Sequence, residues 1–342
     1  FKASTPEDQK IVKAMQGKKM PQIGEIDIQV MEEGQSRWLS FIKDEVDLFA
    51  LDGELTVQAL QDGKLKPELV KKGVQLSRIT DPSIDYHYWN MQNPVVGGLS
   101  KDKIALRRAM AMAFSADNYI NILQKGDAQK LQAPIPSGVV GYDPNYRSSI
   151  PYSVKAANLL LDRYHYTVAA DGWRTQPNGK PLVIEMTLSG NNLRSQQQAE
   201  FWKKTLDSIK IRMTTKSMPF AEALKLEKQC KTMFKASAWI ADYPDADNFM
   251  QLFYGKNIKI TNNGCVKIPE YDRLYEQAQK MTPSPERDAI YAKMSRLLEV
   301  YMPVQVIGAR YRNILAQPRV IGFKKHPILP AEWMYIDIDL KK

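Results

Sequence analysis

The chain has 342 residues, 44% of them hydrophobic and 25% charged, so it can bury the core of two domains or of one large domain. Its 48 basic and 38 acidic residues give a formal net charge of +10, but the basic residues are scattered in pairs and no run reaches five. Nucleic-acid binding is therefore not expected. No stretch approaches the roughly 18 consecutive apolar residues of a membrane span, so the sequence predicts no membrane crossing.

The first 93 residues show alternating helical and extended patterns. These patterns predict a helix-prone stretch at 6–20, strands at 23–30, 46–50, 74–79 and 86–91, and helices at 35–43, 55–60 and 67–72. The strand, helix and strand between 23 and 50 predict a β-α-β unit with a right-handed connection. A boundary follows at 93–98, where a proline and a glycine pair break both helix and strand.

The region after this boundary predicts a second, longer α/β unit. Helices are expected at 101–114, 116–125, 154–163, 193–209, 220–230, 271–281 and 285–301, and strands at 182–188, 211–217, 304–309 and 319–323. Residues 133–151 predict an ordered loop, and Asn178-Gly179 marks a hairpin turn. Elements in this order are typical of a mixed sheet flanked by helices.

The most informative segment is the acidic run from 239 to 249, WIADYPDADNF. Residues 234–240 predict a short apolar strand, and residues 246–254 predict a helix that ends at Gly255. Carboxylates at the carboxyl end of a strand lie where open α/β sheets bind ligands. Asp242 is the candidate for ligand contact, because a carboxylate at a cleft edge pairs with a cation and a strand edge accepts an extended peptide. For Asp245 the preferred interpretation is a cap for the helix that follows.

Other chemistry for these carboxylates is not favoured. A calcium loop needs a different spacing and a glycine, and Pro244 interrupts the run. A hydrolytic pair that includes Asp242 or Asp245 stays as an alternative, but no hydrolase motif is readable and an enzyme is not expected. The three histidines are isolated from the cysteines and from one another, so no metal site and no cofactor are expected.

The two cysteines, Cys230 and Cys265, stand 35 positions apart, a spacing that matches no zinc or redox motif. They either form one disulfide, which fits an oxidising compartment such as the periplasm, or are two unpaired buried thiols. The chain opens with Phe1 and shows no signal sequence, which indicates a mature product whose signal peptide has been removed, a truncated form or one piece of a cleaved protein.

Several short segments carry a resemblance to a known family. They are the segments SFIKDEVD at 40–47, YWNM at 88–91, LRRAMAMAFS at 106–115, AANLL at 156–160, and the acidic run described above. In this order and spacing they resemble the oligopeptide- and dipeptide-binding extracellular solute-binding proteins of ABC transporters, solute-binding protein family 5. The resemblance begins near residue 23 and covers the C-terminal majority of the family fold.

The resemblance implies a type II periplasmic-binding-protein-like α/β fold of two lobes. Residues 1–93 would form part of lobe I, 94–302 lobe II, and 303–342 the return to lobe I. Lobe I would be incomplete in this chain, and a missing N-terminal segment or a separate N-terminal chain would complete it. The implied location is the periplasm, or the outer face of a membrane.

The implied function is that of the substrate-binding component of an ABC importer. It would capture a solute, with peptide favoured, by hinge closure of two lobes and deliver it to a membrane permease. The alternatives are a periplasmic hydrolase and a sensor or scaffold of the same fold.

The resemblance also implies a ligand site. Asp242 would pair with the α-ammonium group of a peptide. The strand residues Ala238, Trp239 and Ile240 would bind its backbone and supply an apolar wall, and Tyr243 belongs to the same site. Asn90 would add a polar contact from a hinge strand.

Overall fold

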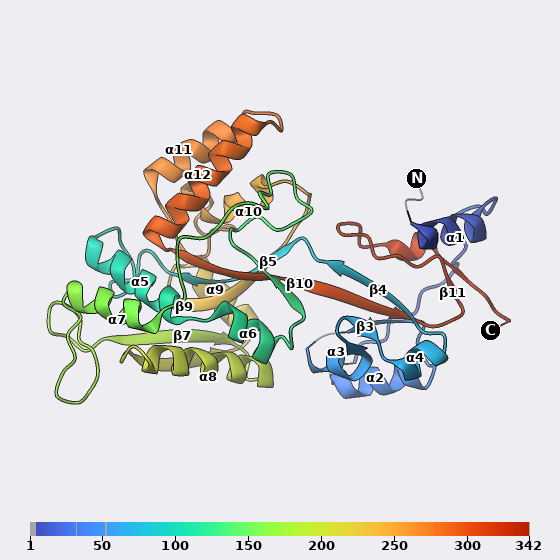
Figure 1. Cartoon of the computed structure of the whole chain (residues 1–342), viewed down its shortest axis with the longest axis horizontal. Coiled ribbons are helices and arrows are strands. Elements are labelled where there is room, and N and C mark those ends of the chain that lie inside the picture. Colours follow the sequence, from blue (N-terminus) through green and yellow to red (C-terminus); the bar gives the residue numbers. More distant parts are fainter. Residues whose placement is uncertain (1–4, 32, 52, 342) are drawn as a thin grey trace. The chain divides into compact units, whose positions relative to one another are not determined.

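A computed structural model describes residues 5–31, 33–51 and 53–341 of the chain (Figure 1). The chain divides into two compact units. Unit 1 contains the described residues up to Asp81, Gln124–Ala128 and the described residues from Arg310 onward. Unit 2 contains Pro82–Leu123 and Gln129–Ala309. No helix in the described part of the chain is long and apolar enough to cross a membrane.

Unit 1 is built on the second half of strand β10, which runs over Val304–Ala316 and pairs antiparallel with β1 and β4. The strands of this unit are β1 (Leu48–Leu51), β2 (Leu60–Gln61), β3 (Lys64–Leu65), β4 (Gln75–Thr80), β11 (Val320–Ile321) and β12 (Asp337–Ile338). Its helices are α1 (Pro6–Met15), α2 (Gly34–Ile42), α3 (Glu54–Ala59), α4 (Pro67–Lys71) and the 3-10 helix Glu332–Tyr335. Stacked rings of Phe41 and Phe49, 5.5 Å apart, join α2 to β1 in its core.

Two sequence predictions in unit 1 were wrong. Residues 23–30 form no strand, although their apolar residues alternate, and Ile28 and Val30 are 72% and 90% exposed. Alternation specifies a strand only where a neighbouring edge is available for pairing, so the expected β-α-β unit is absent from the described residues. Strand β10 is longer than the predicted 304–309, because Arg312 and Asn313 interrupt the apolar pattern but find polar partners in Asp81 and Asp127.

Unit 2 contains a mixed sheet in the order β10-β5-β9-β7-β8. Its own strands are β5 (Ser83–Trp89), β7 (Val183–Ser189), β8 (Arg212–Met218) and β9 (Phe234–Ile240), while β6 (Ala128–Lys130) pairs with β10. Strand β5 pairs antiparallel with β10 and β9, whereas β7 pairs parallel with β9 and β8. The sequence analysis expects residues 83–89 in lobe I. The pairing of β5 with β9 groups them with unit 2. The lobe boundaries at 93 and 302 stay a prediction.

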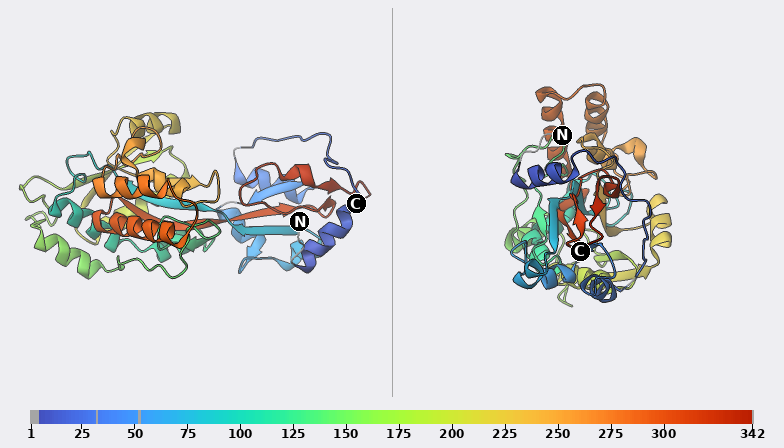
Figure 2. Two further views of the ribbon diagram at one scale, coloured as in Figure 1. Left: turned by 90° about the horizontal axis from the view of Figure 1, so that it is seen from above. Right: turned by 90° about the vertical axis from the view of Figure 1, so that its right-hand side faces the viewer.

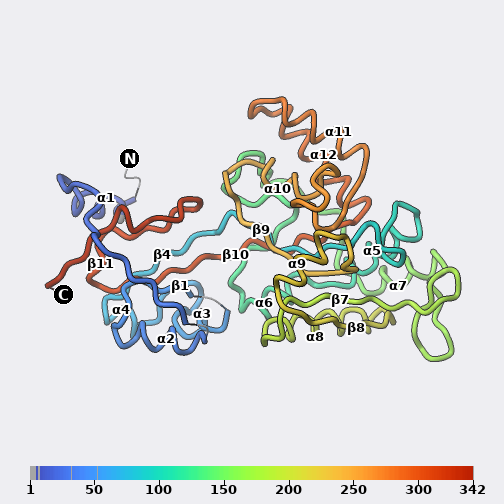
Figure 3. The backbone as a smooth tube through the Cα atoms, turned by 180° about the vertical axis from the view of Figure 1, so that it is seen from behind, coloured from blue at the N-terminus to red at the C-terminus, as the bar shows by residue number. Residues whose placement is uncertain are grey.

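Helices flank this sheet, as the sequence predicts. They are α5 (Lys101–Ala113), α6 (Ala116–Leu123), α7 (Val154–Arg163), α8 (Leu193–Asp207), α9 (Phe220–Lys228), α10 (Asp247–Met250), α11 (Pro269–Ala278) and α12 (Pro285–Tyr301), with 3-10 turns at Gln251–Phe253 and Gly255–Asn257. Figure 3 shows α8 running alongside β7 and β8. Helices α11 and α12 lie side by side as a hairpin (Figure 2).

Aromatic rings fill the space between α8 and the sheet. Trp202 of α8 contacts Phe234 of β9 at 4.6 Å between ring centroids and the His87 ring at 5.0 Å. The indole N–H of Trp202 donates to His87 Nε2 at 3.2 Å, so the proton of the neutral ring is on Nδ1. Burial lowers the pKa of His87 to about 3. The imidazole is therefore a neutral core group.

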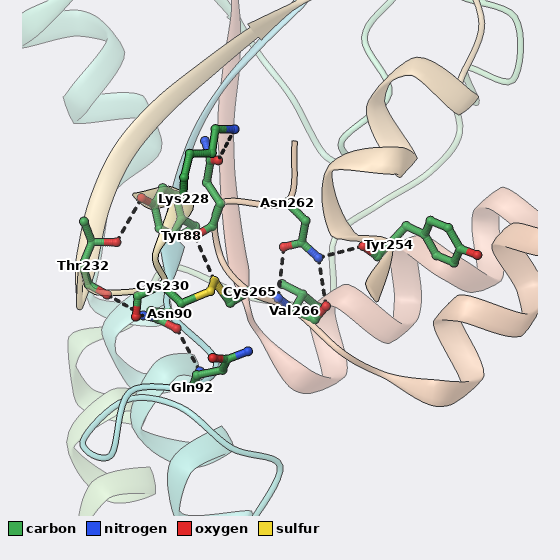
Figure 4. Close-up of a disulfide and its surroundings, with 11 residues drawn as sticks. Tyr88, Asn90, Gln92, Lys228, Cys230, Thr232, Tyr254, Asn262, Cys265 and Val266 are labelled. Atoms are coloured by element: carbon green, nitrogen blue, oxygen red, sulfur yellow. Dashed lines mark hydrogen bonds between the residues drawn. A yellow bond between two sulfur atoms is a disulfide. The ribbon is translucent and has the colours of Figure 1, made fainter. Parts of the chain in front are cut away.

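A disulfide closes the segment that contains β9. Cys230 and Cys265 are bonded, with their Cα atoms 6.1 Å apart, so the disulfide alternative of the sequence analysis is confirmed. Asn90 donates to the carbonyl of Cys230 at 2.6 Å (Figure 4). The Met91 N–H donates to the carbonyl of Gly264 at 2.8 Å. Both ends of the closed loop are thereby fixed to the end of β5.

Because His87 is neutral in the folded protein, we expect acid to destabilise the fold below pH 6.5. The unfolded chain binds a proton there and the folded chain does not until about pH 3. The contribution of His87 to the free energy of unfolding should fall by about 2 kcal/mol between pH 7 and pH 5. Urea titrations at both pH values should show this loss in the wild type and in His165→Asn, an exposed control, but not in His87→Phe. Equal losses in all three proteins would contradict it.

We also expect the disulfide to stabilise unit 2. A bond that closes a loop of 35 residues restricts the unfolded chain and contributes about 4 kcal/mol to the free energy of unfolding. Urea denaturation of Cys230→Ala/Cys265→Ala should show a loss of this size. Reductant should bring the wild type to the same value and leave the double variant unchanged. A loss below about 1 kcal/mol would show that the unfolded chain gains little freedom.

Candidate functional site

The candidate site begins at a strand edge that opens partway along β9. Strand β5 pairs with β9 over its whole length, from Ser83 opposite Ile240 to Trp89 opposite Phe234. Strand β7 pairs with β9 only at Phe234 and Lys235. Beyond Lys235 the two parallel strands separate. The described structure therefore leaves the β7 side of residues 236–240 without a neighbouring strand.

The hydrogen bonds at the two ends of β9 show which backbone groups face this open side. Ala241 donates to Pro82 at 2.8 Å, and Met233 accepts from the Asn90 N–H at 2.9 Å, so the odd-numbered residues bond to β5. In an antiparallel pair the backbone groups of the alternate residues point the other way. The N–H and C=O groups of Ala238 and Ile240 thus face the open edge, and both residues are exposed. An extended chain can pair with such an edge.

Asp242 follows immediately, and one buried amide holds it. Asn248 of α10 is fully buried, and its Oδ1 accepts the backbone N–H of Asp242 at 3.1 Å. Its Nδ2 donates to Asp242 Oδ2 at 3.2 Å, and the Trp239 Nε1–H donates to the same Oδ1 at 2.9 Å. Asp242 itself is exposed. Asn248 thus brings together Trp239 and Asp242, both of which the sequence predicts for the site. The sequence analysis did not identify Asn248 itself.

Tyr243 lies next to Asp242 and is 42% exposed. Its hydroxyl donates to Asp247 Oδ2 at 2.7 Å. Partial burial and this bond raise the pKa of Tyr243 to about 12. The hydroxyl is therefore occupied within the protein, and the ring is the part of this side chain that is available to a ligand.

Asp245 has a structural role. The Arg287 guanidinium of α12 binds both of its carboxylate oxygens, at 2.7 and 2.9 Å. Asp245 Oδ1 also accepts the N–H of Asp247, the first residue of α10, at 2.9 Å. The predicted cap is thus only partly met, because Asp245 binds the first N–H of α10 but the N-cap residue is Ala246. The ion pair fixes the turn after β9 to the α11–α12 hairpin.

Asn90 lies at the opposite end of β5 from this turn. Antiparallel pairing sets Ser83 beside Ile240, so Asn90 is about 30 Å along the strand from Asp242. Its side chain is 1% exposed and donates to the carbonyls of Cys230 and Thr232. The sequence did not show that β5 and β9 run in opposite directions, which places Asn90 far from Asp242. We therefore leave Asn90 out of the proposed site.

The site is an open edge rather than a cavity. Two cavities in unit 2, of about 140 and 500 Å³, are lined mainly by the loop at 130–152 and by α12, and not by residues 238–243. Among the described residues, no cluster of histidine, cysteine or carboxylate side chains could hold a metal ion. The arrangement offers backbone pairing, an aromatic wall and one exposed carboxylate.

The chain is similar in sequence to known proteins. Residues 2–260 match the model of the bacterial extracellular solute-binding proteins, family 5 middle region. The Di/tripeptide-binding protein 2 of Pseudomonas aeruginosa is 24% identical over 250 residues, which are 70% of this chain and 43% of that protein. The probable deoxycholate-binding periplasmic protein YgiS of Escherichia coli is 28% identical over 134 residues, 39% of this chain and 24% of that protein.

Solved structures show the fold. The periplasmic binding protein DppA of Helicobacter pylori, in complex with the peptide STSA, is similar with a TM-score of 0.73 and 21% identity, covering 91% of this chain and 56% of that one. The oligopeptide-binding protein AppA of Bacillus subtilis, with a nonapeptide, has a TM-score of 0.74 and 15% identity, covering 91% and 59%. The chain thus has a type II periplasmic-binding-protein fold and spans about half the length of the proteins that it matches.

Proposed function

The chain belongs to family 5 of the bacterial extracellular solute-binding proteins, and on this premise we propose that it is the substrate-binding component of an ABC importer with a peptide as its solute. The observation that carries the proposal is the open edge of β9, which ends at the exposed carboxylate of Asp242. A peptide adds to this edge as a strand, through the backbone groups of Ala238 and Ile240. Its α-ammonium group pairs with Asp242.

Each contact of this complex uses a group that the structure leaves available. Ala238 and Ile240 are two residues apart, which matches the repeat of an extended peptide. Trp239 and the ring of Tyr243 supply apolar surface for a side chain. Relatives of the chain are named for di- and tripeptides, and one structural neighbour was solved with the peptide STSA. These names support a peptide over the solutes of other neighbours, such as Ni(L-His).

The remaining steps follow from family membership. We propose that the protein works in the periplasm or at the outer face of a membrane and passes its solute to a membrane permease. The two compact units would act as the two lobes whose closure captures the solute. A segment outside this chain would complete the first lobe, in accordance with the share of the relatives that the chain covers.

Hydrolysis by the same carboxylates is disfavoured by their bonding. A hydrolytic pair needs two carboxylates that can reach the substrate. Both oxygens of Asp245 are bound to Arg287, so only Asp242 of this pair is available. We therefore propose that the protein releases its solute unchanged, and chromatography of a peptide after prolonged incubation would reveal any turnover.

The α-ammonium contact gives a direct test. We expect the chain to bind trialanine more tightly than N-acetyl-trialanine, because acetylation removes the charge that Asp242 pairs with. Asp242→Asn should weaken trialanine binding roughly 10- to 100-fold, the loss expected for one charge-assisted hydrogen bond. Isothermal titration calorimetry measures both effects.

A matched control is Asp171→Asn. This exposed aspartate pairs with Arg212, the first residue of β8, and so lies at the other end of the parallel strands. Its substitution should leave affinity unchanged. Equal affinity for both forms of the peptide, or an unaltered Asp242→Asn, would contradict the assignment of the ammonium site. Mass spectrometry of solutes that co-purify with the protein would then identify another ligand class.

A further inference from the structure

Asn248 joins two of the side chains that would contact a ligand at the end of β9, Trp239 and Asp242. An amide oxygen accepts two hydrogen bonds, and Asn248 Oδ1 accepts one from the Trp239 indole at 2.9 Å and one from the Asp242 N–H at 3.1 Å. Its Nδ2 donates to Asp242 Oδ2 at 3.2 Å. We infer that Asn248 is a positioning residue, which sets the orientation of the carboxylate and of the indole before a ligand arrives. The inference rests on the proposed function.

The residue type at this position follows from these three bonds. The three bonds require a neutral side chain that accepts two hydrogen bonds and donates one. The asparagine side chain does this, and its length fits the site. An ionised aspartate could not donate, and a leucine could do neither. Asn248 is itself held in place, because its N–H donates to the carbonyl of Asp245 at 3.1 Å and the Arg287 ion pair fixes that turn.

The tether leaves one carboxylate oxygen for the ligand. Asp242 Oδ2 is occupied by Asn248, whereas Oδ1 has no hydrogen-bond partner among the described residues. A fixed carboxylate and a fixed indole lose little conformational freedom when a ligand binds. Without Asn248 both side chains rotate freely, and binding must order them.

The test compares two buried asparagines. Asn262 is, like Asn248, fully buried, and makes three side-chain hydrogen bonds, two to Val266 and one to the Tyr254 carbonyl, in the disulfide loop (Figure 4). Asn248→Leu and Asn262→Leu therefore each remove three side-chain hydrogen bonds of a buried asparagine. We expect Asn248→Leu to weaken trialanine binding roughly 10-fold or more in calorimetry, and Asn262→Leu to stay within about twofold of the wild type.

A second readout needs no ligand. The indole N–H resonance of Trp239, identified by its loss in Trp239→Phe, reports the bond to Asn248 Oδ1. We expect this resonance to shift in Asn248→Leu and to be unchanged in Asn262→Leu. Asn248→Ser, a smaller polar replacement that cannot span the same bonds, should act like Asn248→Leu and serves where leucine prevents folding.

The outcomes separate the inference from the proposed function. If the wild type binds trialanine and the Asn248 variants bind equally well, the positioning role is wrong and the peptide site stands. If the wild type does not bind trialanine, the proposed peptide function is wrong, and the indole resonance then decides the positioning role alone. An unchanged resonance in the Asn248 variants would overturn that role in either case.

Discussion

The separation of β7 from β9 after Lys235 is the constraint on which the candidate site depends. While two strands are paired, their backbone groups are satisfied and closed to a ligand. Where β7 and β9 separate, β5 remains paired with β9 along its full length, so the free edge stays extended and ordered. A strand that lost both neighbours would not keep this conformation. The open edge combines order with unpaired donors and acceptors, which strand addition requires.

Two long-range connections keep the turn after β9 in place. Arg287 binds Asp245 from α12, and the disulfide closes the loop that contains β9, the acidic turn and Asn248. Asn90 and Met91 then anchor both ends of this loop to β5. The segment that carries the proposed ligand groups is thus fixed to unit 2 at its ends and at its tip. Pre-organisation of this kind lowers the cost of ordering these groups when a ligand binds.

Local patterns predicted most of unit 2, because its helices have a clear apolar face and capping residues. Helices α7 and α12 have the predicted bounds. Unit 1 was predicted less well. Residues 23–30 alternate like a strand but lack a partner, and β10 extends through polar residues that are paired with distant aspartates. In both cases the outcome depends on whether residues far apart in sequence meet, and no local pattern contains that information.

The sequence by itself determined the strand, the acidic turn and the helix at 234–254, because hydrophobic periodicity, proline and short polar residues act locally. It also indicated Asp242, since a carboxylate at the end of a strand is readable from the pattern. Only the tertiary structure decided which carboxylate is free, because Arg287, the partner of Asp245, lies 42 residues away. The opposite directions of β5 and β9 excluded Asn90 from the candidate site, and the packing of α10 against the turn added Asn248 to it. These outcomes depend on which distant groups come into contact, and those contacts form only when the chain folds.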